Sequence, residues 1–189
     1  MKVDVVVLNF NSGNLIDRCI ENLLRFENIN IIVVDNGSTD ESFYILHHYA
    51  MHDRITLIKN SSNLGCPEGL NCAIPYLKNK YVAFLNEDVF PEDGWLKEPI
   101  ELFEKNDTIG AMGFTLYNED GVLETGGNFI DILTGTAGGM KLNRTKWFYT
   151  SYTGLGNLIM RTRLFKKIGV FNGKYFLYWD DNYSYPDFH

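Results

Sequence analysis

The chain has 189 residues, of which 45% are hydrophobic and 22% charged, and its net charge is −7. This length and composition are those of one ordinary globular domain, and the acidic balance argues against nucleic acid as a partner, because binding a phosphate backbone needs clustered Lys and Arg. No apolar stretch approaches the roughly 20 residues of a membrane-spanning helix, and the N-terminus lacks the pattern of a signal peptide. Three cysteines without a CxxC spacing indicate reduced thiols, so we expect a cytoplasmic protein.

Unbroken apolar runs in the first half predict buried strands. They lie at 3–8, 31–34, 55–58 and 81–85. Such runs suit strands that are covered on both faces, as in a parallel sheet. Segments with helical periodicity separate them, so the alternation predicts an α/β fold with a mostly parallel central sheet, flanking helices and right-handed crossovers.

The helices of the first half have recognisable boundary signals. Asn14 followed by Asp17, and Ser38 followed by Glu41, have the spacing of capping boxes at two helix starts. Pro99 is expected to break or kink a later helix, because proline lacks a backbone N–H and clashes with the preceding turn.

The character of the sequence changes near residue 109. Segments become short, glycine is frequent and charge is sparse, which predicts mixed or antiparallel strands with long loops. We therefore expect a single domain over 1–189, with a nucleotide-binding half at 1–108 and an irregular half at 109–189.

Polar clusters follow several of the expected strands. Asn9 and Asn11 follow the first strand, Asp35 the second, and an Asn-Glu-Asp stretch at 86–88 the fourth. Each cluster alone is explained by a turn. However, the carboxyl ends of parallel strands share one edge, where ligands bind, so the clusters should converge. A carboxylate at Asp35 suits the N3–H of uracil or thymine, and a divalent cation that carries a diphosphate needs only one or two protein carboxylates.

Five stretches in chain order resemble the family 2 glycosyltransferases of GT-A fold. They are VVVLNFN at 5–11, VVDNGSTD at 33–40, NLG at 63–65, FLNED at 84–88 and FLYWDD at 176–181. Within that family the chain is similar to rhamnosyltransferase-type and related enzymes of cell-surface polysaccharide synthesis. The resemblance implies inverting transfer of a hexose or deoxyhexose from a UDP- or dTDP-linked donor to a hydroxyl of a carbohydrate or lipid-linked glycan acceptor.

The resemblance also implies roles for the residues of the first half. Asp35 would hold the nucleotide base, with Asn9 and Asn11 beside the nucleoside. Gly65 and Asn71 would shape the loop on the nucleotide side.

The stretch at 86–88 matches the metal-binding motif of the family. Asn86 and Asp88 stand at its outer positions, with Asp88 as the ligand of Mn²⁺ or Mg²⁺ and of the diphosphate. The amide of Asn86 is a poorer ligand for a hard cation than a carboxylate, so we expect it to assist. Glu87 should point to the opposite side of the strand.

A catalytic base is expected near the C-terminus, because an acceptor hydroxyl is a poor nucleophile until a carboxylate takes its proton. By resemblance Asp181 matches the family's base, Asp180 replaces the usual Glu, and Tyr183 stands where a further acid is common. Adjacent residues in an extended segment point to opposite faces, so one of the two aspartates should face the cleft.

The C-terminus leaves alternatives open. The chain ends eight residues after Asp181, whereas typical family members continue with helices that close the acceptor side and sometimes reach a membrane. A trimmed chain, a natural short form and an inactive remnant all account for this end, so the second hypothesis is a nucleotide-sugar-binding module that is catalytically incomplete. Peripheral contact with the inner face of the membrane also stays open. A sugar-phosphate nucleotidyltransferase is disfavoured, because the loop at 9–14 lacks Lys and Arg.

Overall fold

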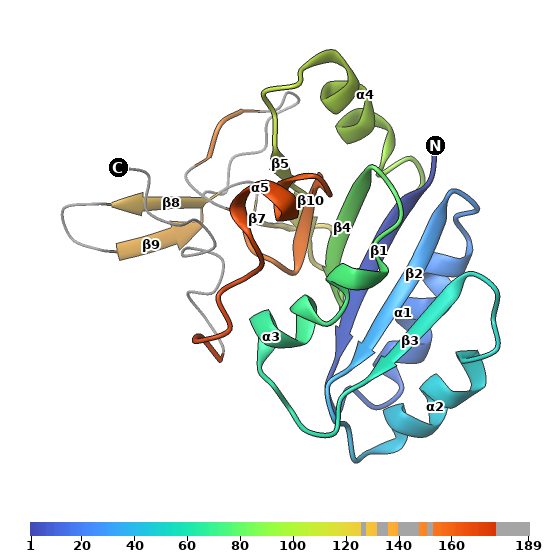
Figure 1. Cartoon of the computed structure of the whole chain (residues 1–189). Coiled ribbons are helices and arrows are strands. Elements are labelled where there is room, and N and C mark those ends of the chain that lie inside the picture. The colour runs from blue at the N-terminus through green and yellow to red at the C-terminus, as the bar shows by residue number, and fades with distance from the viewer. Residues whose placement is uncertain (126–127, 132–135, 140–147, 151–152, 177–189) are drawn as a thin grey trace.

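A six-stranded sheet forms the centre of the molecule, in the order β3-β2-β1-β4-β10-β5 (Figure 1). The computed structural model describes residues 1–125, 128–131, 136–139, 148–150 and 153–176. The parallel strands are β1 (Val3–Asn9), β2 (Ile29–Asp35), β3 (Ile55–Lys59) and β4 (Tyr81–Asn86). On the far side of β4, two further strands complete the sheet: β10 (Asn157–Arg161), which runs antiparallel to β4, and β5 (Ala111–Gly113). The predicted α/β fold with a mostly parallel sheet is confirmed.

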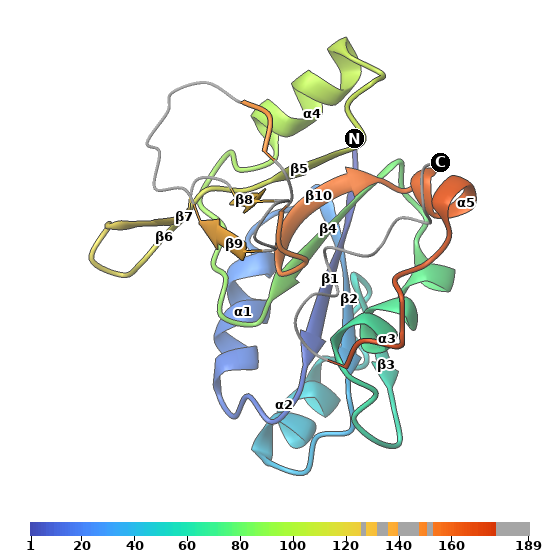
Figure 2. The same cartoon turned by 90° about the vertical axis from the view of Figure 1, so that its left-hand side faces the viewer.

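Helices cover both faces of the sheet, with α1 and α3 on opposite sides (Figure 2). The helices are α1 (Leu15–Leu24), α2 (Glu41–Tyr49), α3 (Cys66–Asn71), α4 (Lys97–Lys105) and α5 (Leu164–Ile168), with a 3₁₀ turn η1 (Ile74–Tyr76) after α3. Successive strand side chains alternate between two buried cores. Val5 and Val7 pack in the core under α1, α2 and α4, whereas Val6 packs in the core under α3 and α5. Burial on both faces explains why the strands read as unbroken apolar runs.

The second half contributes two small antiparallel pairs besides β5 and β10. They are formed by β6 (Leu116–Tyr117) with β7 (Leu123–Thr125), and by β8 (Asn128–Asp131) with β9 (Thr136–Gly139). The expected short strands of mixed direction are therefore found. None of the described helices is long and apolar enough to cross a membrane.

The two predicted capping boxes are not formed. The side chain of Asn14 makes no capping hydrogen bond, because Asn14 itself has helical backbone angles, and Asp17 instead accepts a hydrogen bond from the Tyr49 hydroxyl. The cap of α2 is Asp40, which accepts a hydrogen bond from the Ser42 amide. The Ser38 hydroxyl instead accepts hydrogen bonds from Asn9 and Asn11.

Pro99 does not break α4. The helix begins at Lys97, so proline occupies its first turn, where a backbone N–H would have no partner within the helix.

Asp4 is a buried carboxylate near the amino end of the central strand β1. It accepts hydrogen bonds from the backbone amides of Lys78 (2.7 Å) and Asn79 (2.8 Å), and from the side-chain amides of Asn79 (2.6 Å) and Asn30 (3.3 Å). The single charge within the first apolar run therefore fixes the loop that leads into β4.

We expect Asp4→Ala to lower the free energy of unfolding by about 2–3 kcal/mol, because two amides at a largely buried site lose their acceptor. Urea denaturation followed by circular dichroism would measure the change. Asp53→Ala is the matched control, because the Asp53 side chain is 91% exposed. Equal and small losses in the two variants would contradict the anchoring role of Asp4.

Candidate functional site

The register of the parallel strands brings their polar ends to one edge of the sheet. Asn9 at the end of β1 pairs with Asp35 at the end of β2, and Asp35 pairs with Lys59 at the end of β3. On the other side of β1, Leu8 pairs with Asn86 of β4. The predicted convergence of Asn9, Asp35 and Asn86 is confirmed, and we call this edge the polar edge.

The Asn9 side chain lies fully buried beneath the polar edge. Its Nδ2 donates to Oδ1 of Asp35 (3.1 Å) and to the hydroxyls of Ser38 (3.0 Å) and Ser42 (3.1 Å), and its Oδ1 accepts from the Ser12 hydroxyl. Both ends of the amide are therefore bound within the chain. Asn9 holds Asp35 and the two loops around it, and contact of Asn9 with a nucleoside stays a prediction.

Asp35 presents one oxygen of its carboxylate to the protein. Oδ1 accepts from Asn9 and from the backbone amide of Ser38 (3.3 Å), whereas Oδ2 accepts no hydrogen bond from the described residues. Asp35 is almost fully buried, with a relative exposure of 2%. A fixed carboxylate with one uncommitted oxygen is suited to accept a hydrogen bond from a ligand.

Asn11 joins the loop after β1 to the loop after β2. Its backbone has a positive φ of 52°, its Oδ1 accepts from the Thr39 amide (2.8 Å), and its own amide donates to the Ser38 hydroxyl (3.0 Å). Asp40 adds a second link, because it accepts from the Gly13 amide (2.8 Å). Burial opposes ionisation of Asp40, but hydrogen bonds from Ser42 and Gly13 outweigh it and lower the pKa of this carboxyl.

Asn36 organises the loop after β3, a role that the sequence analysis missed. Its Nδ2 donates to Oδ1 of Asn63 (2.9 Å) and to the carbonyl of Gly65 (3.1 Å). Its Oδ1 accepts from Asn60 Nδ2 (3.0 Å) and from the Leu64 amide (3.1 Å). The only sequence signal was an amide side chain directly after Asp35, and its partners lie 24 to 29 residues away.

Gly65 allows the second half of the chain to approach α3. Its φ is +83°, and a Cβ there would lie 2.5 Å from the carbonyl oxygen of Phe176. The adjacent Cys66 amide donates to that carbonyl (2.8 Å). Glycine is thus required by conformation and by packing, and a direct role of Gly65 toward a nucleotide stays a prediction.

Asn71 binds the same returning segment one helical turn later. Its Nδ2 donates to the Phe171 carbonyl (2.9 Å), and its Oδ1 accepts from the Phe171 amide (3.0 Å). The Asn71 side chain therefore pairs with backbone as a strand would. It connects α3 to the chain that leads away from α5.

The stretch at 86–88 stands at the end of β4, where Asn86 and Asp88 are exposed and Glu87 is half-buried. The backbone amide of Asn86 donates to the Gly156 carbonyl (2.9 Å), and a Cβ on Gly156 would overlap the Asn86 amide. The carboxylate of Asp88 accepts no hydrogen bond from the described residues. Asp88 is therefore available to a ligand, and Gly156 fixes the space that Asn86 occupies.

Glu87 and Asp88 also act on the buried thiol of α1. Burial, and then the charges of Glu87 and Asp88, raise the pKa of Cys19 to about 12. Burial and the Asp88 charge likewise raise the pKa of Glu87. Cys19 is therefore protonated at neutral pH and is a poor metal ligand or nucleophile.

The described residues contain no group of three His, Cys, Asp or Glu side chains that could hold a metal ion. A cation at Asp88 would therefore take most of its ligands from a bound diphosphate and water, which is usual for Mg²⁺ in phosphate-binding sites. Asp181, the predicted base, and Asp180 lie outside the described residues.

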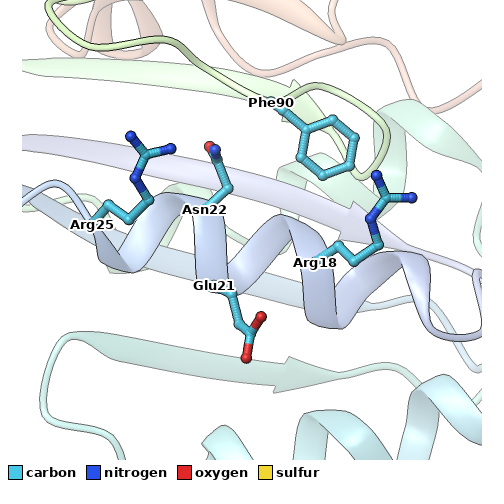
Figure 3. Close-up of a pocket in the computed structure, with 5 residues that line it drawn as sticks. All are labelled: Arg18, Glu21, Asn22, Arg25 and Phe90. Atoms are coloured by element: carbon cyan, nitrogen blue, oxygen red, sulfur yellow. The ribbon is translucent and has the colours of Figure 1, made fainter. Parts of the chain in front are cut away.

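A shallow groove lies between α1 and the loop that carries Phe90 (Figure 3). It is lined by Arg18, Glu21, Asn22, Arg25 and Phe90. The guanidinium of Arg18 lies 5.1 Å from the centre of the Phe90 ring, and Arg25 pairs with Asp93 at 3.1 Å. Two cations are balanced by Glu21 and Asp93, so this groove offers no net charge to a diphosphate.

The sheet order and the polar edge define a nucleotide-binding α/β fold of GT-A type. The structure of the mannosyltransferase PcManGT from Pyrobaculum calidifontis in complex with GDP-Man and Mn²⁺ is similar, with a TM-score of 0.70 and 16% identity. The match covers 97% of this chain and 50% of that chain. At this identity the likeness is one of fold.

The sequence pattern of Glycosyl transferase family 2 matches residues 4–169, and the chain belongs to that family. It is 25% identical to the glycosyltransferase GlyG of Streptococcus pneumoniae serotype 4, over 92% of this chain and 61% of the relative. It is 32% identical to the Escherichia coli UDP-Glc:alpha-D-GlcNAc-diphosphoundecaprenol beta-1,3-glucosyltransferase WfaP, over 52% of this chain and 38% of the relative. The chain thus spans less than two thirds of the length of these two curated relatives.

Gly156→Ala tests the close packing beneath Asn86. We expect Gly156→Ala to lower the free energy of unfolding in urea denaturation by about 1–3 kcal/mol, because the added methyl group would overlap the Asn86 amide. Gly110→Ala is the control, since a Cβ there meets only the end of the Leu164 side chain, at 3.1 Å. Equal stability of the two variants would contradict the close packing of Gly156 against Asn86.

Proposed function

We propose that the chain is the donor-binding and catalytic part of a metal-dependent, inverting glycosyltransferase of polysaccharide synthesis. The donor would be a UDP- or dTDP-sugar and the acceptor a hydroxyl of a glycan. The observation that carries the proposal is the joint position of Asp35, with its uncommitted Oδ2, and of exposed Asp88 at one edge of the parallel sheet. The name of the relative WfaP, which specifies UDP-Glc, supports a uridine nucleotide.

Asp35 would accept the N3–H of the base. Its Oδ1 is held by the buried Asn9 amide and by the Ser38 amide, so the carboxylate does not need to be ordered when a ligand arrives. A buried carboxylate left without a donor is costly, which favours a base that presents an N–H over cytosine, which has none at this position.

Asp88, with help from Asn86, would hold Mn²⁺ or Mg²⁺ together with the diphosphate. The carboxylate of Asp88 is exposed and has no hydrogen-bond partner in the part of the chain that the structure describes, which suits a hard cation. The described residues form no three-residue metal cluster, which fits a cation whose shell is completed by substrate. When bound, the cation supplies positive charge that stabilises the departing diphosphate.

Asp181 would act as general base toward the acceptor. It takes the proton of the acceptor hydroxyl while the oxygen attacks the anomeric carbon from the side opposite the diphosphate, so the configuration inverts. The contact of Phe176 with Cys66 supports this assignment, because the described chain ends beside α3, five residues before Asp181 in the sequence.

The acceptor would be a carbohydrate or a lipid-linked glycan, processed at the cytoplasmic face of the membrane. The support is the name of WfaP, whose acceptor is a sugar on diphosphoundecaprenol. Peripheral membrane association of this chain belongs to the same proposal.

Nucleotide binding can be tested by thermal shift with UDP-, dTDP- and GDP-sugars, with and without Mn²⁺ or Mg²⁺. A ligand that binds only the folded state adds about 2.7 kcal/mol at a hundredfold excess over its Kd. We expect Asp88→Ala to remove the metal-dependent part of the shift, while the exposed neighbour Glu92→Ala retains it. A full metal-dependent shift in Asp88→Ala would refute the metal assignment.

Measuring sugar transfer beside nucleotide binding distinguishes the role of the catalytic base from that of the donor site. We expect Asp181→Asn to keep the nucleotide shift and to lower transfer by about 10²- to 10⁴-fold, the usual contribution of a general base. Asp180→Asn is the adjacent control and should retain activity. Normal transfer by Asp181→Asn would remove it from the mechanism, and donor binding without transfer by the wild type would favour a binding module.

A further inference from the structure

A second groove, at the opposite end of the sheet from the polar edge, is strongly basic. Its lining includes Lys78, Lys80, Arg161, Arg163 and Lys166, and no carboxylate. Lys80 directly precedes β4, and Arg161 ends the antiparallel β10, so the groove lies at the amino ends of the parallel strands. On a chain with a net charge of −7, this concentration of cations is unexpected.

The nearby carboxylates neutralise only part of this charge. Lys80 pairs with Glu104 at 2.8 Å, and Arg163 lies 3.7 Å from Asp107. Across the described residues, no carboxylate lies within ion-pair distance of Lys78 or Lys166, and both are exposed. Arg161 also lies 3.4 Å from Asp107, and Asp4 is buried beneath Lys78. Five cations against three carboxylates leave a net positive surface.

Arg161 belongs to the wall of the groove. The residue is 1% exposed, and its guanidinium donates to the carbonyls of Ile109, Asn106 and Phe103 at the end of α4. Asp4 holds the backbone of Lys78 from below, as described above. Buried hydrogen bonds therefore fix the backbone at Lys78 and the side chain of Arg161.

Exposed apolar side chains flank the basic groove. Tyr76 is 47% exposed and precedes Lys78 by two residues, and Val170 is 54% exposed and follows Lys167 on the chain that leaves α5. Leu77 and Phe171, the sequence neighbours of Tyr76 and Val170, belong to the same core, so both flanks belong to one side of the sheet. In Figure 2, α5 lies at the end of the sheet that is remote from α2.

We propose that this surface, which comprises Lys78, Lys80, Arg163, Lys166 and Lys167 with Tyr76 and Val170 and which we call the basic face, docks on an anionic phospholipid bilayer. Lysine and arginine beside an exposed tyrosine are the composition that settles at a charged membrane surface. The apolar flanks favour a bilayer over a soluble polyanion, which would leave them in water. The inference rests on the proposed function, in which the acceptor is a glycan linked to a membrane lipid.

Docking through the basic face leaves the polar edge in the aqueous phase, where nucleotide sugars are dissolved. The two ends are separated by the length of β4, which has six residues and spans about 20 Å. A glycan attached to a membrane lipid must cover that span to reach the polar edge. Within the proposed lipid-linked glycans, this arrangement therefore favours an extended glycan of several sugars over a single lipid-linked sugar such as the one in the name of WfaP.

The test is flotation of the full chain with vesicles of phosphatidylglycerol and phosphatidylcholine, against vesicles of phosphatidylcholine alone, at low and at high salt. Each basic side chain near an anionic surface strengthens partition about fivefold, and salt screens the effect. We expect Lys78→Gln with Lys166→Gln to weaken partition roughly 25-fold. Lys59→Gln with Lys97→Gln removes the same charge from exposed positions outside the basic face and should bind as the wild type does.

Several outcomes would overturn the proposal: no flotation of the wild type, equal loss in both double variants, insensitivity to salt, or binding of soluble polyphosphate without binding of vesicles. Thermal shift with UDP-sugars keeps the two proposals apart. Failure of every nucleotide, with flotation as expected, counts against the donor site alone. A nucleotide shift with wild-type flotation of the Lys78→Gln, Lys166→Gln variant counts against the basic face alone.

Discussion

The site depends first on the register of β1 with its two parallel neighbours. Asn9 pairs with Asp35 at the polar edge, and Asn86 of β4 pairs with Leu8, the residue before Asn9. A slip of one residue would turn each side chain to the other face and separate the carboxylate from its amide. The buried Asn9 amide is hydrogen-bonded to Asp35, Ser38 and Ser42 only in the correct register, so these bonds favour that register over a slipped one.

The second constraint is the return of the chain to α3 after α5. Asn71 pairs with the Phe171 backbone, and Gly65 admits the Phe176 carbonyl to the Cys66 amide, so residues 100 or more positions apart are tied together. β10 lies between β4 and β5, and the two halves of the chain therefore share one sheet. This packing brings residues late in the sequence close to the loop that leads into α3.

Part of this arrangement could be predicted from the sequence. Strands covered on both faces leave an unbroken apolar run, and a polar residue directly after such a run marks the ligand edge, as for Asp35 and Asn86. Asn36 and Gly156 were missed because their partners are distant in sequence and no local pattern encodes them. The capping boxes failed for a related reason: Ser38 and Asp17 have the right spacing, but tertiary partners, Asn9 and Tyr49, use their side chains.

The two ends of the sheet differ in chemistry because different elements complete them. At the carboxyl ends, strand termini supply Asp35 and Asp88, whose uncommitted oxygens suit a ligand N–H and a cation. At the amino ends, the loop before β4 and helix α5 supply lysines, and the buried Asp4 holds the backbone of Lys78. An anionic membrane would attract the second end, whereas the polar edge, about 20 Å away, lies beyond the roughly 8 Å over which the membrane potential is screened. The same charge distribution that draws the chain to an anionic surface would therefore turn the donor site toward the solution.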